Sequence, residues 1–207
     1  MRNLGVIFDS ELKFEQQINA VVKNSFFHLR SISKLKSILT FNNMEKVVHA
    51  FVSSRLDYCN VLYLGVSQAS LSRLQLVQNS AARLLTGTKK REHITPVLIK
   101  LHWLPIRYRI QYKALLDVFK SLHGLATEYV TDLISRCQSS RSLRSNDQLL
   151  LVVPRTRLKC KGDRAFSVAA PRLWNDLPLS VKTCPSLGVF QSALKTYLFS
   201  LAFDNAL

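Results

Sequence analysis

Apolar residues recur at steps of three and four along most of the chain, which is the period of an α-helix with one buried face. The first helix is predicted to begin near Phe14 and to end near Leu35. Its apolar face carries Phe14, Ile18, Val21, Val22, Phe26, Leu29, Ile32 and Leu35. A second helix is predicted over residues 43–54, with Asn42 or Asn43 as its N-cap and with Met44, Val47, Val48, Phe51 and Val52 inward.

More helices follow in the same region. They are predicted from Ser67 or Ser70 to Thr86 with Gly87 as C-cap, from Thr95–Pro96 to near His102, over 107–122 and over 127–136. The pattern therefore predicts a helical body over residues 10–136.

Three short segments have the composition of strands rather than helices. Residues 4–8 (LGVIF) are rich in β-branched and aromatic residues, but no neighbouring segment offers them a partner. A polar, Ser-rich linker is predicted over 137–148, and "LLLVVP" and "RTRLK" after it have the composition of two short strands.

Helices are predicted over 165–176 and 187–202. The predicted fold is mainly α, with one short strand before the helical body and a small α+β C-terminal unit (a short β-hairpin plus two helices) over 149–207.

Charge changes this picture more than any other property of the chain. The 207 residues include 29 Lys and Arg against 13 Asp and Glu, which gives a net charge of +16. Such an excess opposes compaction unless something anionic lies nearby, and nucleic acid is the commonest such partner. An anionic membrane surface is the second candidate, and an alkaline solvated surface is the third interpretation.

The location of the protein is predicted from what the sequence does not contain. The N-terminal apolar run stops at Asp9, before the apolar region of a signal peptide would be complete. No apolar stretch approaches the roughly 18 residues of a membrane span. The four cysteines are scattered and form no metal-binding spacing, which is typical of reduced thiols. We therefore expect an intracellular protein, in the nucleus or cytoplasm, that is neither secreted nor membrane-spanning and has no membrane partner.

Three groups of basic residues are candidate phosphate contacts. Two are stripes on predicted helices, and the third is an alternating run that would place four cations on one face of an extended strand. The candidate nucleic-acid-binding residues are Lys23, Arg30 and Lys34; Arg109, Lys113 and Lys120; and Arg155, Arg157, Lys159 and Lys161. For each group an ordinary solvated surface is the alternative, and for the strand this would be an edge protected by its charges.

Catalytic chemistry has little support in the sequence. Phosphate-binding glycine loops, a nucleophile elbow and a His-Glu-x-x-His helix are all absent from it. Asp9 and Glu11 could together hold a magnesium ion, but acidic residues at the start of a helix more often cap it. We therefore predict no catalytic residues, no metal, no cofactor and no small-molecule substrate.

The segment "GDRAFSVAAPRLWNDLP" is predicted to have a structural role. Gly162 would let the chain turn after the basic strand, Asp163 would cap the following helix, and Pro178 would end it. Trp174 would supply the largest apolar surface and anchor the C-terminal unit.

Long blocks of the chain carry a family resemblance. "LGVIFDSELKFEQQINAVV" resembles the Leu-Gly-Val-x-x-Asp segment that follows the polymerase palm in reverse transcriptases of LINE-type, non-LTR retrotransposons. "FVSSRLDYCNVLYLGVSQASLSRLQLVQNSAARLLTG", "ITPVLIKLHWLPIRYRIQYKALLDVFKSLHG" and "GDRAFSVAAPRLWNDLPLSVKTCPSLGVFQSALKTYLF" are similar to the region downstream of it in animal elements of the CR1/L2/Rex kind. The blocks occur in order and cover nearly the whole chain.

The resemblance implies a C-terminal fragment of an RNA-directed DNA polymerase. Residues 1–9 would be a remnant of the palm, residues 10–136 the helical thumb and connector, and the remainder the C-terminal region. The palm carboxylates and their Tyr-x-Asp-Asp motif are not in this sequence, so the chain alone is expected not to be an enzyme. It would instead bind RNA or a template–primer (RNA–DNA) duplex through backbone contacts. The alternatives are a module that binds a protein through exposed apolar helix faces, or a non-functional truncated gene copy.

Overall fold

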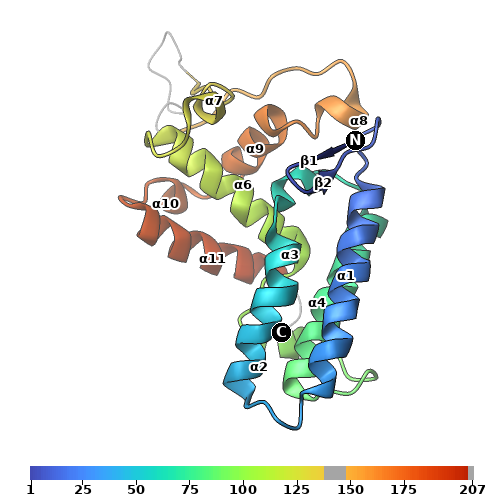
Figure 1. Ribbon diagram of the computed structural model, residues 1–207. Coiled ribbons are helices and arrows are strands. Elements are labelled where there is room, and N and C mark those ends of the chain that lie inside the picture. Colours follow the sequence, from blue (N-terminus) through green and yellow to red (C-terminus); the bar gives the residue numbers. More distant parts are fainter. Residues whose placement is uncertain (138–147, 205–207) are drawn as a thin grey trace. The chain divides into compact units, whose positions relative to one another are not determined.

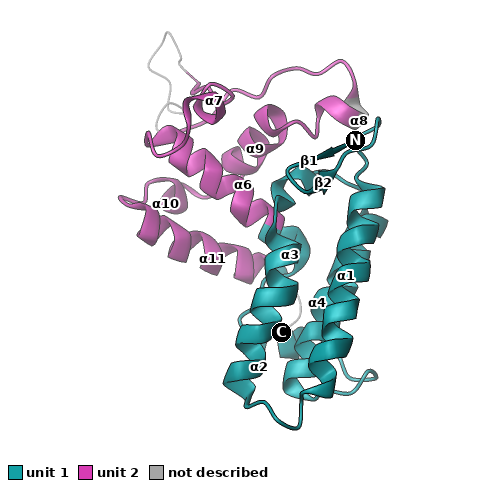
Figure 2. Ribbon diagram, viewed as in Figure 1, with its two compact units in different colours: residues 1–109, 202–207 teal, residues 110–201 magenta. Residues whose placement is uncertain are grey.

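The computed structural model describes residues 1–137 and 148–204, and helices make up most of them (Figure 1). The mainly α fold predicted from the sequence is therefore confirmed. The chain forms two compact units, one of residues 1–109 with 202–207 and one of residues 110–201 (Figure 2). Most of the predicted linker at 137–148 lies outside the described residues, and the predicted domain boundaries stay a prediction.

The first unit begins with a small β-hairpin. Strand β1 (Arg2–Asn3) pairs antiparallel with β2 (Val6–Ile7), so that Arg2 lies opposite Ile7. Leu4 and Gly5 connect them with φ angles of 46° and 82°, as the tightest hairpin turns require. The prediction of an unpartnered strand at residues 4–8 was wrong, because the partner strand immediately precedes it. A leucine rarely adopts a positive φ, and its residue type therefore did not indicate a turn.

Helices form the rest of the first unit. They are α1 (Glu15–Lys34), α2 (Phe41–Val48), a π-helical turn (His49–Ser53), α3 (Ser54–Asp57), a 3₁₀ turn (Asn60–Tyr63), α4 (Gln68–Thr86), α5 (Thr95–Lys100) and the start of α6 (Ile106–Leu122). Helices α1 and α4 pack side by side and contribute much of the core. The C-cap at Gly87 has the predicted positive φ, 73°. The N-cap of α2 is Thr40 rather than an asparagine, because the Thr40 hydroxyl accepts the Asn43 N–H (3.4 Å).

The π-helical turn changes which residues of this helical segment are buried. The Ser54 N–H bonds to the carbonyl of His49, five residues earlier, so the turn holds one residue more than an α-helical turn. Phe51, predicted to face inward, is 47% exposed, whereas Val52 and Leu56 are buried. The inward prediction for Phe51 failed because it assumed an unbroken α-helical period.

The second unit surrounds a core of aromatic side chains. Its helices are the remainder of α6, α7 (Glu128–Thr131), α8 (Lys159–Gly162), α9 (Phe166–Asn175), α10 (Leu179–Lys182) and most of α11 (Leu187–Phe203). The rings of Phe119 and Phe190 stack at 4.2 Å, and Trp174 lies 6.0 Å from Phe190 between ring centroids. Trp174 is 1% exposed, the position expected of an anchor.

The predicted C-terminal β-hairpin is absent from the described residues. Instead, two neighbouring side chains of α9 hold the first of its segments. The Trp174 indole N–H donates to the Leu149 carbonyl (2.9 Å), and the Asn175 amide exchanges two hydrogen bonds with the backbone of Leu151 (2.8 and 2.9 Å). Leu151 also forms an isolated bridge with Arg136. These partners satisfy the backbone that a second strand would otherwise pair with.

The predicted basic strand is also replaced, and the residues after it explain why. The chain turns through α8, and a Cβ atom on Gly162 would lie only 2.7 Å from Cβ of Thr156. Asp163 accepts a hydrogen bond from the Thr156 hydroxyl (2.6 Å) and pairs with Arg172 (3.1 Å), so it is not the predicted cap of α9. Gly162 is thus needed for close packing, and Pro178 lies beyond α9, immediately before α10.

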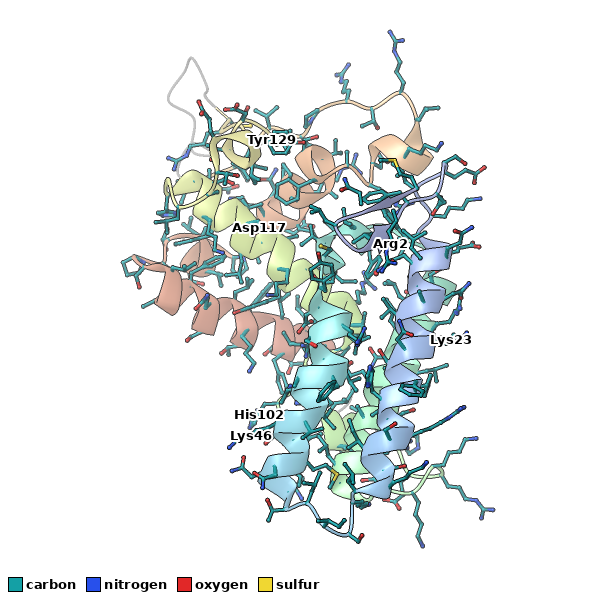
Figure 3. The ribbon with its side chains drawn as sticks, in the orientation of Figure 1. Arg2, Lys23, Lys46, His102, Asp117 and Tyr129 are labelled. Atoms are coloured by element: carbon teal, nitrogen blue, oxygen red, sulfur yellow. The ribbon has the colours of Figure 1, made fainter. Side chains whose placement is uncertain are left out.

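We expect Trp174→Ala to lower the free energy of unfolding by about 3–5 kcal/mol, because it removes a buried ring and its hydrogen bond to Leu149. Chemical denaturation monitored by circular dichroism measures the loss. Tyr129→Ala is the control in the same unit, because Tyr129 is 77% exposed (Figure 3) and its removal should change little. A Trp174→Ala variant as stable as this control would contradict the anchoring role.

Candidate nucleic-acid interface

The first group of predicted phosphate contacts forms a row on α1. Lys23, Arg30 and Lys34 are exposed, and their spacing of seven and four places them on one side of the helix. In Figure 3 the Lys23 side chain lies on the outer side of α1. The row extends over eleven residue steps, or roughly 16 Å at the α-helical rise. It is thus long enough to contact several phosphates of one strand.

An aromatic ring interrupts this row. Phe27 follows Lys23 by four residues and precedes Arg30 by three, so it belongs to the same side of α1, and it is 65% exposed. Its ring centroid lies 5.5 Å from that of His28, which in turn lies 5.3 Å from the ring of Phe51. Sequence reasoning missed Phe27, although its place in the 4-3-4 spacing of Lys23, Phe27, Arg30 and Lys34 was a visible signal.

The row continues into two loops at the C-terminal ends of α1 and α4. The ammonium nitrogen of Lys36 lies 3.7 Å from where a Cβ atom of Gly87 would be, which brings the loop after α1 next to the loop after α4. The latter carries three exposed cations, Lys89, Lys90 and Arg91. Both helices end here, and the negative ends of their dipoles stabilise these charges.

Arg83 holds the loop after α4 through hydrogen bonds to its backbone. Its guanidinium donates to the carbonyls of Lys89 (3.4 Å), Lys90 (3.4 Å) and Glu92 (2.6 Å). The Glu92 carboxylate accepts the backbone N–H of Lys89 (3.1 Å). The loop backbone is therefore held by Arg83 and Glu92, and the three cationic side chains beyond it are exposed.

We call this set the basic edge: Lys23, Arg30, Lys34, Lys36, Lys89, Lys90 and Arg91. Across residues 1–137 and 148–204, none of the seven forms an ion pair. Of these seven residues, only Lys23, Arg30 and Lys34 were predicted from the sequence as phosphate contacts. The proximity of the two loops depends on the packing of α1 against α4, which the sequence does not show.

The second predicted group, on α6, is neutralised. The Arg109 guanidinium forms a bidentate ion pair with Asp57, and its Nε lies 2.9 Å from Oδ1. Asp117 lies between Lys113 and Lys120 on the same side of the helix and interacts with both charges. Sequence reasoning did not consider Asp117, although it lies four residues after Lys113. Because two carboxylates oppose the three cations, α6 is a weaker phosphate-binding surface than α1.

The third predicted group does not form a single row. Arg155 and Arg157 are exposed in a segment without regular structure, and Lys161 is exposed in α8. Lys159 lies in α8 too, but its side chain is outside the described part. The interpretation that these four cations share one face of a strand was therefore wrong, because the chain turns into a helix after Leu158.

The carboxylates near the N-terminus have structural partners. Asp9 accepts the backbone N–H groups of Glu11 (3.1 Å), Lys13 (2.8 Å) and Phe14 (2.5 Å). Burial tends to raise the pKa of Asp9, but these hydrogen bonds outweigh it and the pKa is lowered. Glu11 pairs with Lys13. These contacts favour the structural interpretation of this pair over magnesium binding.

In the part of the chain that the structure describes, no three His, Cys, Asp or Glu side chains lie together as a metal site would require. None of the helices described is both long enough and apolar enough to cross a membrane. The chain matches no model of a protein family, no curated protein and no solved structure.

Asp117 leads to a pH-dependent prediction. Its burial raises its pKa above the ordinary value of 3.8, although Lys120 and Lys113 act in the opposite direction. Between 3.8 and the raised pKa the folded state binds more protons than the unfolded state, so the unfolding free energy falls as pH rises. Asp117→Asn should therefore be more stable than the wild type at pH 7, and this advantage should disappear below pH 3.8.

Urea denaturation of both proteins at neutral and acidic pH measures this difference. Asp132→Asn is the control, because Asp132 is exposed in the same unit. An Asp117→Asn variant that is less stable than the wild type at pH 7 would show that the carboxylate contributes more through the two lysines than burial costs.

Proposed function

We propose that this protein binds nucleic acid through the phosphate backbone, and that the basic edge is the surface that does so. The observation that carries the proposal is the set of seven exposed cations without ion pairs among the described residues. Lys and Arg side chains of this kind contact phosphates and release condensed counterions, which drives binding without regard to base sequence. The net charge of +16 acts in the same direction.

We further propose that the chain is the C-terminal, thumb-like part of a reverse transcriptase of LINE-type, non-LTR retrotransposons. The support is the ordered resemblance of its sequence blocks, together with a mainly helical first unit. In this proposal the chain holds RNA or an RNA–DNA duplex and does not itself polymerise, because the carboxylates that bind the two metal ions belong to the palm. Such a protein would act in the nucleus or cytoplasm.

A salt titration tests the phosphate contacts. We expect the logarithm of the association constant for an RNA–DNA duplex to fall linearly with the logarithm of the salt concentration. The slope should be steep, since each phosphate contact releases close to one counterion. Replacing Lys89, Lys90 and Arg91 together by Gln should reduce the magnitude of the slope by about 2–3. Fluorescence anisotropy with a labelled duplex measures both quantities.

The matched control removes three exposed cations of the same unit that lie outside the basic edge: Lys46, Lys100 and Arg107. These changes alter the net charge equally but remove no proposed contact. A slope that falls as much in the control as in the loop variant would show that only the net charge matters. An affinity that does not change with salt would contradict phosphate binding altogether.

Phe27 allows a second test, because an exposed ring between cations is suited to stacking on an unpaired base. Phe27→Ala should weaken binding of single-stranded RNA by about 1–3 kcal/mol and leave binding of a fully paired duplex unchanged. Leu76→Ala is the control, because Leu76 is 58% exposed elsewhere in the same unit. Equal losses for single-stranded and paired RNA would exclude stacking on an unpaired base.

One observation favours the alternative function of a protein-binding module. A groove of about 530 Å³ on the first unit is lined mostly by apolar side chains, among them Leu71, Leu76 and Ile94. Exposed apolar surface of this kind is typical of protein interfaces. A stable complex with a protein, disrupted by Leu76→Ala and formed by a chain without affinity for nucleic acid, would select this function over the first.

A further inference from the structure

A pocket of about 400 Å³ lies beneath the N-terminal hairpin, within the first unit. Residues of β1 and β2, the N-terminal half of α1 and the helix after the π-helical turn line it together. Its volume falls in the range of small-ligand sites. The pocket is distinct from the basic edge, since the two share no residue, and it was not indicated by any sequence motif.

The charges around this pocket are all positive. Arg2 and Arg55 both line it, and no Asp or Glu does. Across the described ranges, neither guanidinium has an ion pair or a hydrogen bond. In Figure 3 the Arg2 side chain extends from the hairpin toward the space between α1 and α3. Two like charges at one cavity repel each other, and a bound anion would remove this repulsion.

Two hydrogen bonds within the chain hold the frame of the pocket. The Tyr58 hydroxyl donates to the Leu4 carbonyl in the hairpin turn (2.6 Å), and the Ile7 N–H donates to the Gln17 side chain (2.9 Å). These bonds tie the hairpin to the helices on both sides of the pocket. A frame that is held in this way loses less conformational freedom when a ligand binds, which lowers the cost of binding.

The π-helical turn positions two of the lining residues. Arg55 and Tyr58 follow it directly, and its extra residue rotates them by about 100° relative to an uninterrupted α-helix. Such turns occur frequently at functional sites. The turn thus directs Arg55 and Tyr58 toward the cavity that Arg2 also lines.

We propose that this pocket binds a phosphate monoester whose organic part lies against the apolar side of the cavity. A monoester carries a charge of about −1.5 to −2 at pH 7, which matches two guanidinium groups better than a carboxylate or a backbone diester does. Ile7, Ala20 and Val21 provide the apolar wall, and Asn24 adds an amide next to it. The ligand is a nucleoside monophosphate or the terminal phosphorylated nucleotide of a strand, which present the same chemistry.

Adenosine monophosphate is the first probe, with dimethyl phosphate as the singly charged comparison. Isothermal titration calorimetry on the full chain should show one site for the monophosphate and much weaker binding of the diester. Arg55→Gln should weaken the binding of the monophosphate by about tenfold or more. Arg55 is exposed, so this variant is expected to fold. Arg2→Gln should have the same effect from the other side of the pocket.

Arg107→Gln is the matched control, because it removes an exposed arginine of the same unit outside the pocket and should leave the affinity unchanged. Affinity should also rise between pH 5 and pH 7, as the monoester loses its second proton while arginine keeps its charge. Failure of the wild type to bind the monophosphate, or equal weakening by Arg55→Gln and Arg107→Gln, would overturn the proposal.

Oligonucleotides then distinguish the two sources of the ligand. If the pocket takes a strand end, a 5′- or 3′-phosphorylated strand binds more tightly than its unphosphorylated form, and Arg55→Gln abolishes the difference. If it takes a free mononucleotide, the strands bind equally and the monophosphate alone is sensitive to Arg55→Gln. Loss of strand binding in the Lys89, Lys90 and Arg91 variant with the monophosphate still bound separates this pocket from the basic edge.

Discussion

The scarcity of carboxylates is the constraint on which the surface of this protein depends. With 13 acidic residues against 29 basic ones, every carboxylate placed in a structural contact leaves more cations without a partner. In the first unit, Asp9 holds a backbone turn and Asp57 holds Arg109. The few acids thus support the fold, and the cations that remain define the regions where an anion can bind. The basic edge and the pocket beneath the hairpin are two such regions.

The helical period predicted most of the helices, because it depends only on which residues of one segment are apolar. The same local argument placed Lys23, Arg30 and Lys34 on an exposed side of α1. It failed wherever a distant group decided the outcome. Trp174 and Asn175 satisfy the backbone of residues 149–151, so no hairpin partner is needed there. No periodic pattern contains that information, because the partners are about 25 residues apart in the chain.

The neutralisation of α6 has the same origin. A row of cations can be recognised from its spacing, but its net charge depends on which carboxylates the fold brings beside it. Asp57 reaches Arg109 across 52 positions of the sequence, and only the tertiary structure reveals that pairing. Positive φ values at Leu4 and the widened turn at His49–Ser53 are likewise consequences of packing. They oppose the local preference of the residues involved.

The widened turn at His49–Ser53 makes this segment tolerant of losing one residue. Loss of any one residue within it would restore ordinary α-helical hydrogen bonding, so the helix itself would be preserved. The residues beyond it would keep their direction, because the deletion removes the same rotation of about 100° that the extra residue adds, and Tyr58 would still face the Leu4 carbonyl. Among related sequences we therefore expect one-residue gaps to be tolerated in this turn, whereas a one-residue gap within α1 or α4 would turn every residue beyond it by about 100°.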